Sequence, residues 1–540
     1  MPGTFGVSGY VVLLIYIIAT VALGLSFARK QSNLTDYFLA ERSAPWWAVG
    51  ISVIACDLSA ISYMGSPAYT FYKDLRLPMS GLIVPFVAWF VAFLFIPFLA
   101  RLQVFTIYEY LEHRFCLCSR LFASFLFSMQ RAAHMAIAIF TVALALQQII
   151  GWHVTACVLL IGGITTLYTV FGGMKAVLWT DVMQFFVLMG GLAVMLWAVL
   201  WQFNGDVAHI WNVAAAAGHT KMFTWNSNLW DPEFWTEMTV WAILWGTVFT
   251  NVATYGSDQV LVQRYIAAGS GRLMTRSLMF SAFLTMPVMA LLYFLGFGFF
   301  AYYHAPENAA LLASLNELVA RTGDKDNMIM PHFILNVLPS ALGGLVFAAL
   351  FAATMSVFSS GLNSLSTVTC IDYIQRLRRV KVDSKELTLQ NARWVTFVWG
   401  IVVTLAAISV HFMDRRSIVE QAVAVIGFFS GPMLGMFLLG MFSMRANSIG
   451  AILGAFCGFA MLLFITGWVG FVLNGLFGTA PLALTTSYVS FMWYPVIGCL
   501  ATISFGLILS YLGPPEPREN VYPMTIWGRD KKWERLKASL

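Results

Sequence analysis

Long apolar runs, separated by shorter polar segments, dominate the chain. A helix needs roughly 20 apolar residues to cross a hydrocarbon core about 30 Å thick. Thirteen runs reach or approach this length, so the pattern predicts an all-α integral membrane protein with thirteen transmembrane helices. The predicted spans are Val7–Phe27, Trp46–Phe71, Gly81–Leu99, Leu121–Ile150, Val154–Val170, Val182–Trp201, Met238–Tyr255, Leu278–Tyr302, Leu342–Val368, Trp394–Val410, Val419–Phe442, Ile449–Gly470 and Phe491–Leu512.

The second predicted span is interrupted near its centre by polar and helix-breaking residues. Asp57 stands near the middle, and Ser59, Ser62 and Pro67 follow it. Ionisable groups inside spans usually face a cavity, and irregular backbone at that depth is tolerated only where it lines one. A kinked helix whose hydroxyls bond back to the preceding turn also explains the serines. A kink needs no carboxylate, however, so Asp57 favours a binding site.

The seventh predicted span is interrupted in a similar way, by Asn251, Thr254, Tyr255 and Gly256. It lies five spans after the second. Two broken segments in matching positions of two halves indicate a transporter binding site. Because five spans is an odd number, the halves, spans 2–6 and 7–11, must be inverted relative to each other.

Two further polar features leave alternatives open. Ser356, Ser359, Ser360 and Asn363 in the ninth span follow spacings of three and four, which places them along one helix face. Such a stripe serves either as helix-packing contacts or as oxygen ligands for a small cation. Asp181, at the start of the sixth span, is either a carboxylate favoured by a helix N-terminus or a cation ligand.

The distribution of basic residues predicts the orientation. Of the 31 Lys and Arg residues, 23 lie in loops after odd-numbered spans or in the C-terminal tail, seven lie in loops after even-numbered spans, and Arg131 lies inside a span. Cytoplasmic loops carry the excess of Lys and Arg. We therefore expect a multi-pass plasma (inner) membrane protein whose N-terminus is outside and whose C-terminus is cytoplasmic.

The chain is expected to form one transmembrane domain over residues 1–540. Its predicted parts are an extra N-terminal helix and loop (1–45), a first repeat (46–205), a second repeat (235–447), the last two helices (448–512) and a cytoplasmic tail (513–540).

Composition excludes several classes of protein. Hydrophobic residues make up 59% of the chain and charged residues 10%, whereas soluble domains carry about 25% charged residues. No HExxH, GxSxG or Walker sequence is present, so we expect no enzyme. A channel would need a continuous polar pore, but only a few spans carry polar stripes. Neither a nucleic-acid partner nor an obligate protein partner is indicated.

Several stretches resemble the sodium/solute symporter family over almost the whole length of the chain, and the branch with bacterial sialic acid and sugar transporters looks most similar. The matching stretches are DYFLAERSAPWW (36–47), the AxxLS run at 55–59, TIYEYLEHRF (106–115), TLYTVFGGMKAVLWTDVMQ (166–184), SDQVLVQRY (257–265), SSGLNS (359–364) and GPMLGMFLLGMFSMRAN (431–447).

The resemblance implies a LeuT-like fold with a five-plus-five inverted repeat, broken helices 2 and 7, and transport driven by Na⁺. It also implies a first sodium site at Ala55, Leu58, Ala353 and Ser356. The family places a second hydroxyl where this chain has Val357, so one side-chain oxygen is missing.

A second sodium site, found in some sialic acid transporters of the family, corresponds to Asp181, Ser359 and Ser360 together with Ser356. Oxygen ligands suit a small, hard ion such as sodium.

The resemblance also places solute contacts on one group of residues between the broken segments and the fourth span. These residues are Asp57, Ser59, Ser62, His134, Asn251 and Tyr255. The sialic acid transporters have an arginine where His134 stands and a hydroxyl where Asp57 stands. Because an aspartate repels a carboxylate, a sialic acid substrate is disfavoured here.

The sequence therefore predicts a sodium-coupled symporter that imports a small polar organic solute, such as a sugar, a polyol or a related compound. Sodium, the solute and the lipid bilayer are its expected partners. Two alternatives on the same fold remain open: a proton-coupled transporter that uses Asp57 or Asp181 as proton carrier, and a symporter for an amine or cationic solute.

Overall fold

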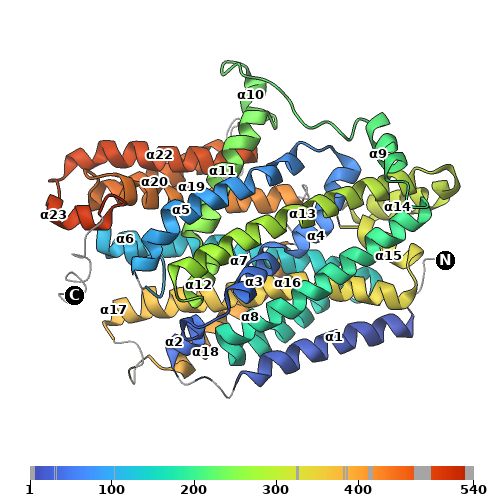
Figure 1. Cartoon of the computed structure of the whole chain (residues 1–540), viewed down its shortest axis with the longest axis horizontal. Coiled ribbons are helices and arrows are strands. Elements are labelled where there is room, and N and C mark those ends of the chain that lie inside the picture. Colours follow the sequence, from blue (N-terminus) through green and yellow to red (C-terminus); the bar gives the residue numbers. More distant parts are fainter. Residues whose placement is uncertain are drawn as a thin grey trace, which may run out of the picture.

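In the computed structural model the chain is an assembly of helices that run roughly side by side (Figure 1). The structure describes residues 6–528 except 29–30, 32, 103, 324–326, 381–383, 385–386, 411–417 and 468–487. Residues 529–540 of the predicted tail thus lie outside the described part. No strand occurs among the described residues, so the all-α prediction is confirmed.

The predicted spans coincide with long helices. Ten single helices are long and apolar enough to cross a membrane, and one bent helix pair raises that number to eleven. The count of thirteen is not reached among the described residues and stays a prediction. The ten helices are α1 (Val7–Ser26), α5 (Val84–Leu102), α7 (Leu117–Ile150), α8 (Val154–Gln202), α13 (Gly271–Tyr303), α16 (Ser340–Val368), α18 (Leu389–Ser409), α19 (Ile418–Phe442), α20 (Ser448–Ile465) and α22 (Tyr494–Leu509), and the bent pair is α3 (Trp46–Asp57) with α4 (Ala60–Tyr72). Helix α11 (Val240–Ser257), which holds most of the seventh predicted span, is not among these ten.

The lower count has a physical reason at α8, which holds both the fifth and the sixth predicted spans. A straight helix of its 49 residues would be about 74 Å long, more than twice the hydrocarbon thickness. Gly173 breaks it with φ 57° and ψ −165°, a conformation open to glycine but strained for other residues. Both arms reach the same turn of α16, since Tyr168 donates to the Met355 carbonyl and Asp181 accepts from Ser356.

The predicted break in the seventh span is at the wrong residues. Helix α11 continues through Asn251, Tyr255 and Gly256 and ends at Ser257. The chain leaves the helical conformation at Asp258 (φ −80°, ψ 122°), and α12 (Gln259–Ala267) begins directly after it. Polar residues inside one turn are compatible with helix when neighbouring helices cover them. The Asp258 carboxylate, in contrast, caps α12 by accepting from the Val260 N–H.

The short connecting elements separate into two ends of the helix assembly (Figure 1). Four that follow odd-numbered predicted spans lie toward one end, and three that follow even-numbered spans lie toward the other, whereas α10 (Pro232–Thr236), which follows the sixth span, projects from the top of the view. The first group is α2 (Leu34–Leu39), α6 (Glu109–Arg114), α17 (Arg376–Arg378) and α23 (Arg518–Val521), and the second is α9 (Val207–Ala216), α14 (Ala309–Thr322) and α15 (Ile329–Val337).

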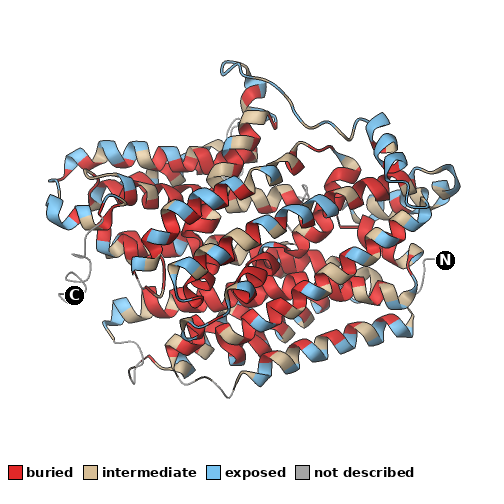
Figure 2. Ribbon diagram, in the orientation of Figure 1, coloured by how far each residue is buried: buried red, intermediate tan, exposed pale blue. Residues whose placement is uncertain are grey.

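Helix α16 forms the centre of the core. Every residue from Val346 to Val368 is buried, and the helix contacts α1, α3, α4, α7, α8 and α18. Figure 2 shows the buried residues concentrated in this interior, with exposed residues toward the periphery. The hydroxyl stripe of the ninth predicted span therefore faces protein on all sides and not lipid.

Candidate functional site

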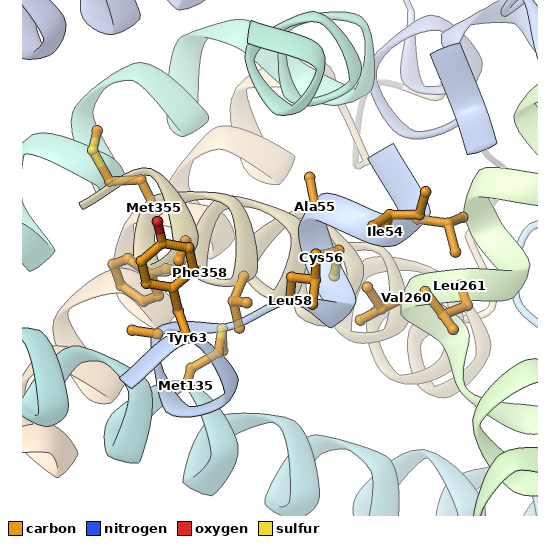
Figure 3. Packing of buried hydrophobic residues seen from close by; sticks show 14 of the residues in the cluster. Ile54, Ala55, Cys56, Leu58, Tyr63, Met135, Val260, Leu261, Met355 and Phe358 are labelled. Carbon is orange, nitrogen blue, oxygen red and sulfur yellow. The ribbon is translucent and has the colours of Figure 1, made fainter. Parts of the chain in front are cut away.

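The break between α3 and α4 supplies backbone oxygens at the centre of the assembly. The two helices meet at an angle of 57°. Leu58 (ψ 74°) and Ser59 (ψ 167°) are non-helical, and the Ser59 hydroxyl starts α4 by accepting from the Ser62 N–H at 3.4 Å. Figure 3 shows the break between Leu58 and Tyr63, with Met135 of α7 and Phe358 of α16 beside it. The predicted break in the second span is thus confirmed.

Two carbonyl groups lose their helical partners at this break. In a continuous helix the Ala55 carbonyl would accept from the N–H of Ser59, and the Leu58 carbonyl would accept from the N–H of Ser62. The Ser59 N–H instead donates to the Asp57 carbonyl at 2.9 Å, and the Ser62 N–H donates to the Ser59 hydroxyl. Buried carbonyls without their usual donors are suited to bind a cation.

Helix α16, which holds the other predicted first-site residues, contacts both α3 and α4. Ala353 and Ser356 lie in its fully buried stretch. The Ser356 hydroxyl donates to Oδ1 of Asp181 at 2.7 Å. Val357 is fully buried and presents only methyl groups where a second hydroxyl was expected.

The predicted second sodium site contains an arginine that the sequence analysis did not assign. Asp181 accepts from Ser52, Ser356 and Ser360, and its Oδ2 also accepts from Nη2 of Arg264 at 3.1 Å. Both charged side chains are completely buried. Arg264 also donates from Nη1 to the Val260 carbonyl at 2.8 Å.

The guanidinium group therefore acts as the counter-ion of Asp181 in this arrangement. Burying two charges is expensive unless each one is paired and hydrogen-bonded, and here both conditions hold. Nη2 of Arg264 also donates to Ser360, so it lies among the oxygens that the second site would use. Ser359 is less involved, because its hydroxyl donates to the Ser356 carbonyl at 3.2 Å. A sodium ion bound here would have to displace Arg264 from these oxygens.

Asp57 is more exposed than the residues around it in the chain. Its side chain is exposed, although Cys56, Leu58 and Ser59 around it are each no more than 2% exposed. Within the described part of the chain, no hydrogen bond or ion pair involves its carboxylate. A solvent-accessible carboxylate among buried neighbours leaves a polar group at the break open to a ligand.

A buried ion pair lies in electrostatic range of Asp57. Nη2 of Arg131 on α7 donates to Oδ2 of Asp258 at 2.8 Å, and both residues interact electrostatically with Asp57. These three groups together carry one net negative charge. His134, one turn along α7 from Arg131, has a buried Nδ1 for which the described residues provide no hydrogen-bond partner. The same holds for the Thr247 hydroxyl.

The other predicted solute contacts differ in burial and in hydrogen bonding. Tyr255 is buried and interacts electrostatically with Asp57. Asn251 and Ser62 are half-buried, but the Asn251 amide donates to the Thr247 carbonyl of its own helix at 2.9 Å. Ser59 is buried and serves as the N-cap of α4.

Sequence reasoning missed Ser52, Arg131, Asp258 and Arg264 as site residues. Two signals could have pointed to them. Arg131 is the one basic residue within a predicted span, and a charge at that position usually faces the bundle interior. Asp258 and Arg264 both lie in the short SDQVLVQRY stretch, which puts an acidic and a basic residue within about two helix turns of each other.

Comparison with known proteins identifies the family. The model of the sodium:solute symporter family matches residues 37–458. The sodium/sialic acid symporter SiaT of Proteus mirabilis is 32% identical over 511 residues, covering 95% of this chain and 96% of the relative. The sodium/sialic acid symporter NanT of Aliivibrio fischeri is 30% identical over 525 residues, covering 96% and 95% respectively.

A solved structure gives the same result. The substrate-bound, outward-open state of a Na⁺-coupled sialic acid symporter superposes with a TM-score of 0.81 at 30% identity, covering 95% of this chain and all of that one. These relatives are sodium-coupled transporters and not enzymes. The chain described here therefore belongs to the sodium:solute symporter family.

Proposed function

We propose that this symporter imports a small, polar, uncharged organic solute, such as a sugar or a polyol, together with sodium. The observation that carries the proposal is the exposed carboxylate of Asp57, which lies at the break between α3 and α4 and is unpaired within the described residues. A carboxylate accepts strong hydrogen bonds from hydroxyl groups. Nδ1 of His134 and the Thr247 hydroxyl, which have no hydrogen-bond partner among the described residues, are proposed as further partners for a polyhydroxylated solute.

The charge balance around Asp57 argues against an acidic solute. Asp57, Asp258 and Arg131 leave one net negative charge, and Arg131 is already paired with Asp258. A carboxylate on the solute would be repelled by Asp57 without gaining an unpaired cation. The relatives named above are symporters of sialic acid, an acid, so this chain is proposed to differ from them in substrate.

The remaining predicted contacts complete the proposed solute site. Ser59 and Ser62 lie at the start of α4, and Tyr255 and Asn251 lie on α11; all four are proposed to line the same break and to orient the solute. Tyr255 interacts with Asp57, and the side chains of Asn251 and Ser62 are only half-buried.

Sodium is proposed to bind first between the break and α16, through the carbonyls of Ala55, Leu58 and Ala353 and the hydroxyl of Ser356. Support comes from the two carbonyls that lost their helical donors. An ion held there would join α3 to α16 and fix the shape of the break. Because solute contacts lie on the same break, ion and solute would raise each other's affinity reciprocally.

The second site, at Asp181, Ser359 and Ser360, is proposed to be conditional on Arg264. Its carboxylate is neutralised by Arg264, so sodium competes there with a tethered cation. The first site is therefore proposed to carry the coupling.

An amine-bearing solute is the second candidate, and one observation favours it. The carboxylate of Asp57, unpaired among the described residues, leaves a net negative charge that would balance an ammonium group.

The orientation is proposed from the basic loops: N-terminus outside and C-terminus in the cytoplasm of a plasma (inner) membrane. Residues 46–205 and 235–447 are proposed as the two inverted repeats.

Uptake by proteoliposomes tests these proposals. Radiolabelled sugars, polyols, amines and sialic acid are offered under an inward sodium gradient, with potassium and proton gradients of equal size as controls. Accumulation of a neutral sugar or polyol under the sodium gradient alone supports the proposal. Accumulation of amines alone favours the second candidate. Sodium-driven accumulation of sialic acid would overturn the argument from Asp57, and accumulation that follows only the proton gradient would overturn sodium coupling.

A further inference from the structure

A groove on the periphery of the assembly lies between α18 and the first arm of α8. Asp57 is not one of its lining residues. The volume of the groove is about 500 Å³. Its lining residues include Leu159, Gly163, Leu167, Arg393, Trp394 and Leu405. Apart from a few polar groups, the walls consist of hydrocarbon.

The groove faces the exterior of the helix assembly and not its core. Leu159, Leu167 and Leu405 are 52%, 50% and 56% exposed. Both helices are apolar spans, so this surface faces lipid in a membrane. An apolar, lipid-facing groove can hold a hydrocarbon chain without burying polar groups that lack hydrogen-bond partners.

Glycine residues shape the floor of the groove. A Cβ atom at Gly162 would collide with Thr404, and one at Gly400 would collide with Thr166, so the two helices approach closely at this crossing. Gly163 differs, because nothing lies within 4 Å of where its Cβ would be. A side chain at Gly163 would therefore enter open groove space without touching the protein.

One end of the groove is polar and basic. Arg393 lies there in the first turns of α18, beside Trp394 and Gln390. Its Nη2 donates to the Ala28 carbonyl at 3.3 Å, and its guanidinium lies 5.8 Å from the Phe171 ring centroid. Its Nε is buried and has no hydrogen-bond partner among the described residues.

We propose that this groove binds one anionic phospholipid, with an acyl chain along the apolar walls and the phosphate on Arg393. Arginine matches phosphate geometry, and basic pockets between membrane helices bind anionic headgroups. Trp394 is 58% exposed and adjacent to Arg393, as expected of an aromatic residue at headgroup level. The charge at one end and the hydrocarbon along the rest together select a lipid with a negative headgroup.

The experiment measures lipid retention on the purified, delipidated full-length protein by native mass spectrometry. The probes are phosphatidylglycerol and phosphatidylcholine with identical acyl chains. The variants are Gly163→Leu, which fills the groove, and Arg393→Gln, which removes the charge. Matched controls are Gly190→Leu, on the second arm of α8 with only Leu345 at 3.9 Å, and the exposed Arg276→Gln at the start of α13.

Wild-type protein should retain phosphatidylglycerol at least fivefold better than phosphatidylcholine. Arg393→Gln should abolish this preference, Gly163→Leu should reduce retention of both lipids, and the control variants should behave like wild type. The proposal is overturned if the wild type does not distinguish the two headgroups, or if Gly163→Leu retains phosphatidylglycerol as well as Gly190→Leu does. It is also overturned if the groove is covered by a second copy of the chain, seen as a dimer that Gly163→Leu dissociates.

Discussion

Nη2 of Arg264 lies 3.1 Å from Oδ2 of Asp181, and neither side chain is exposed. This pair joins α12 to the second arm of α8 at the centre of the helix assembly. It also involves the hydroxyls of Ser52 and Ser360. The guanidinium group of Arg264 therefore lies where a second transported cation is proposed to bind. Replacing Arg264 tests whether it occupies that cation's place.

Replacing Arg264 with glutamine should destabilise the protein and make its thermal stability depend on sodium. Removing one partner of a buried pair costs about 3–5 kcal/mol, since it leaves an uncompensated charge. Sodium should restore part of this loss by binding to Asp181, whereas potassium should not. Thermal unfolding in NaCl and KCl checks this result. Equal rescue by both salts, or the same loss in the control Arg276→Gln, would contradict it.

Replacing Asp57 with asparagine should separate solute binding from sodium binding. A hydrogen bond to a charged group is worth about 1.5–3 kcal/mol, so solute affinity should fall about tenfold or more. Sodium-dependent stabilisation should persist, because the proposed first site uses backbone carbonyls and the Ser356 hydroxyl. Solute uptake and sodium titration of the melting temperature give the two readouts. Loss of the sodium response together with uptake would show that Asp57 itself is an ion ligand.

Replacing Val357 with threonine should strengthen the proposed first sodium site. The change keeps the side-chain shape and adds the hydroxyl that the family resemblance places there. Without sodium, the buried hydroxyl is unsatisfied and should cost about 1–3 kcal/mol. Sodium titration of thermal stability should then show a several-fold lower half-saturating concentration. The matched control is Val368→Thr in the same buried helix, and a similar sodium response in both variants would argue against the site.

His332, on α15 outside the membrane-spanning helices, should make stability depend on pH. Its ring lies 2.8 Å from the Tyr303 hydroxyl and 3.0 Å from the Ser314 hydroxyl, which joins α13, α14 and α15. Burial lowers the pKa of His332 from 6.5 to about 4. Between these values the unfolded chain binds a proton that the folded chain does not, so stability falls as pH drops from about 6.5 toward 4.

At pH 5 this difference amounts to about 2 kcal/mol. His332→Gln should flatten the dependence of the melting temperature on pH between 7 and 5, at a small cost near pH 7.5. His209→Gln, which alters an exposed histidine, should leave the dependence unchanged. An unaltered pH slope in His332→Gln would assign the acid sensitivity to another group.

The sequence could predict those features that depend on local patterns. Apolar runs located the long helices, because a backbone in lipid must satisfy its hydrogen bonds within each segment. Asp57, Ser59 and Pro67 in one apolar run predicted the break between α3 and α4. Serines at spacings of three and four predicted one polar face on α16, since helix periodicity fixes which residues share a face.

Only the tertiary structure decided which groups meet across distant segments. It moved the break of the seventh span from Asn251–Gly256 to Asp258, because helical turns with polar side chains are stable when packing covers them. It also brought Arg264 to Asp181 and Arg131 to Asp258, pairs separated by 83 and 127 residues. Periodicity carries no information about such pairings, because they depend on how whole helices pack. For this chain the sequence alone determined the helices and their polar faces, and the packing determined the partner of each buried charge.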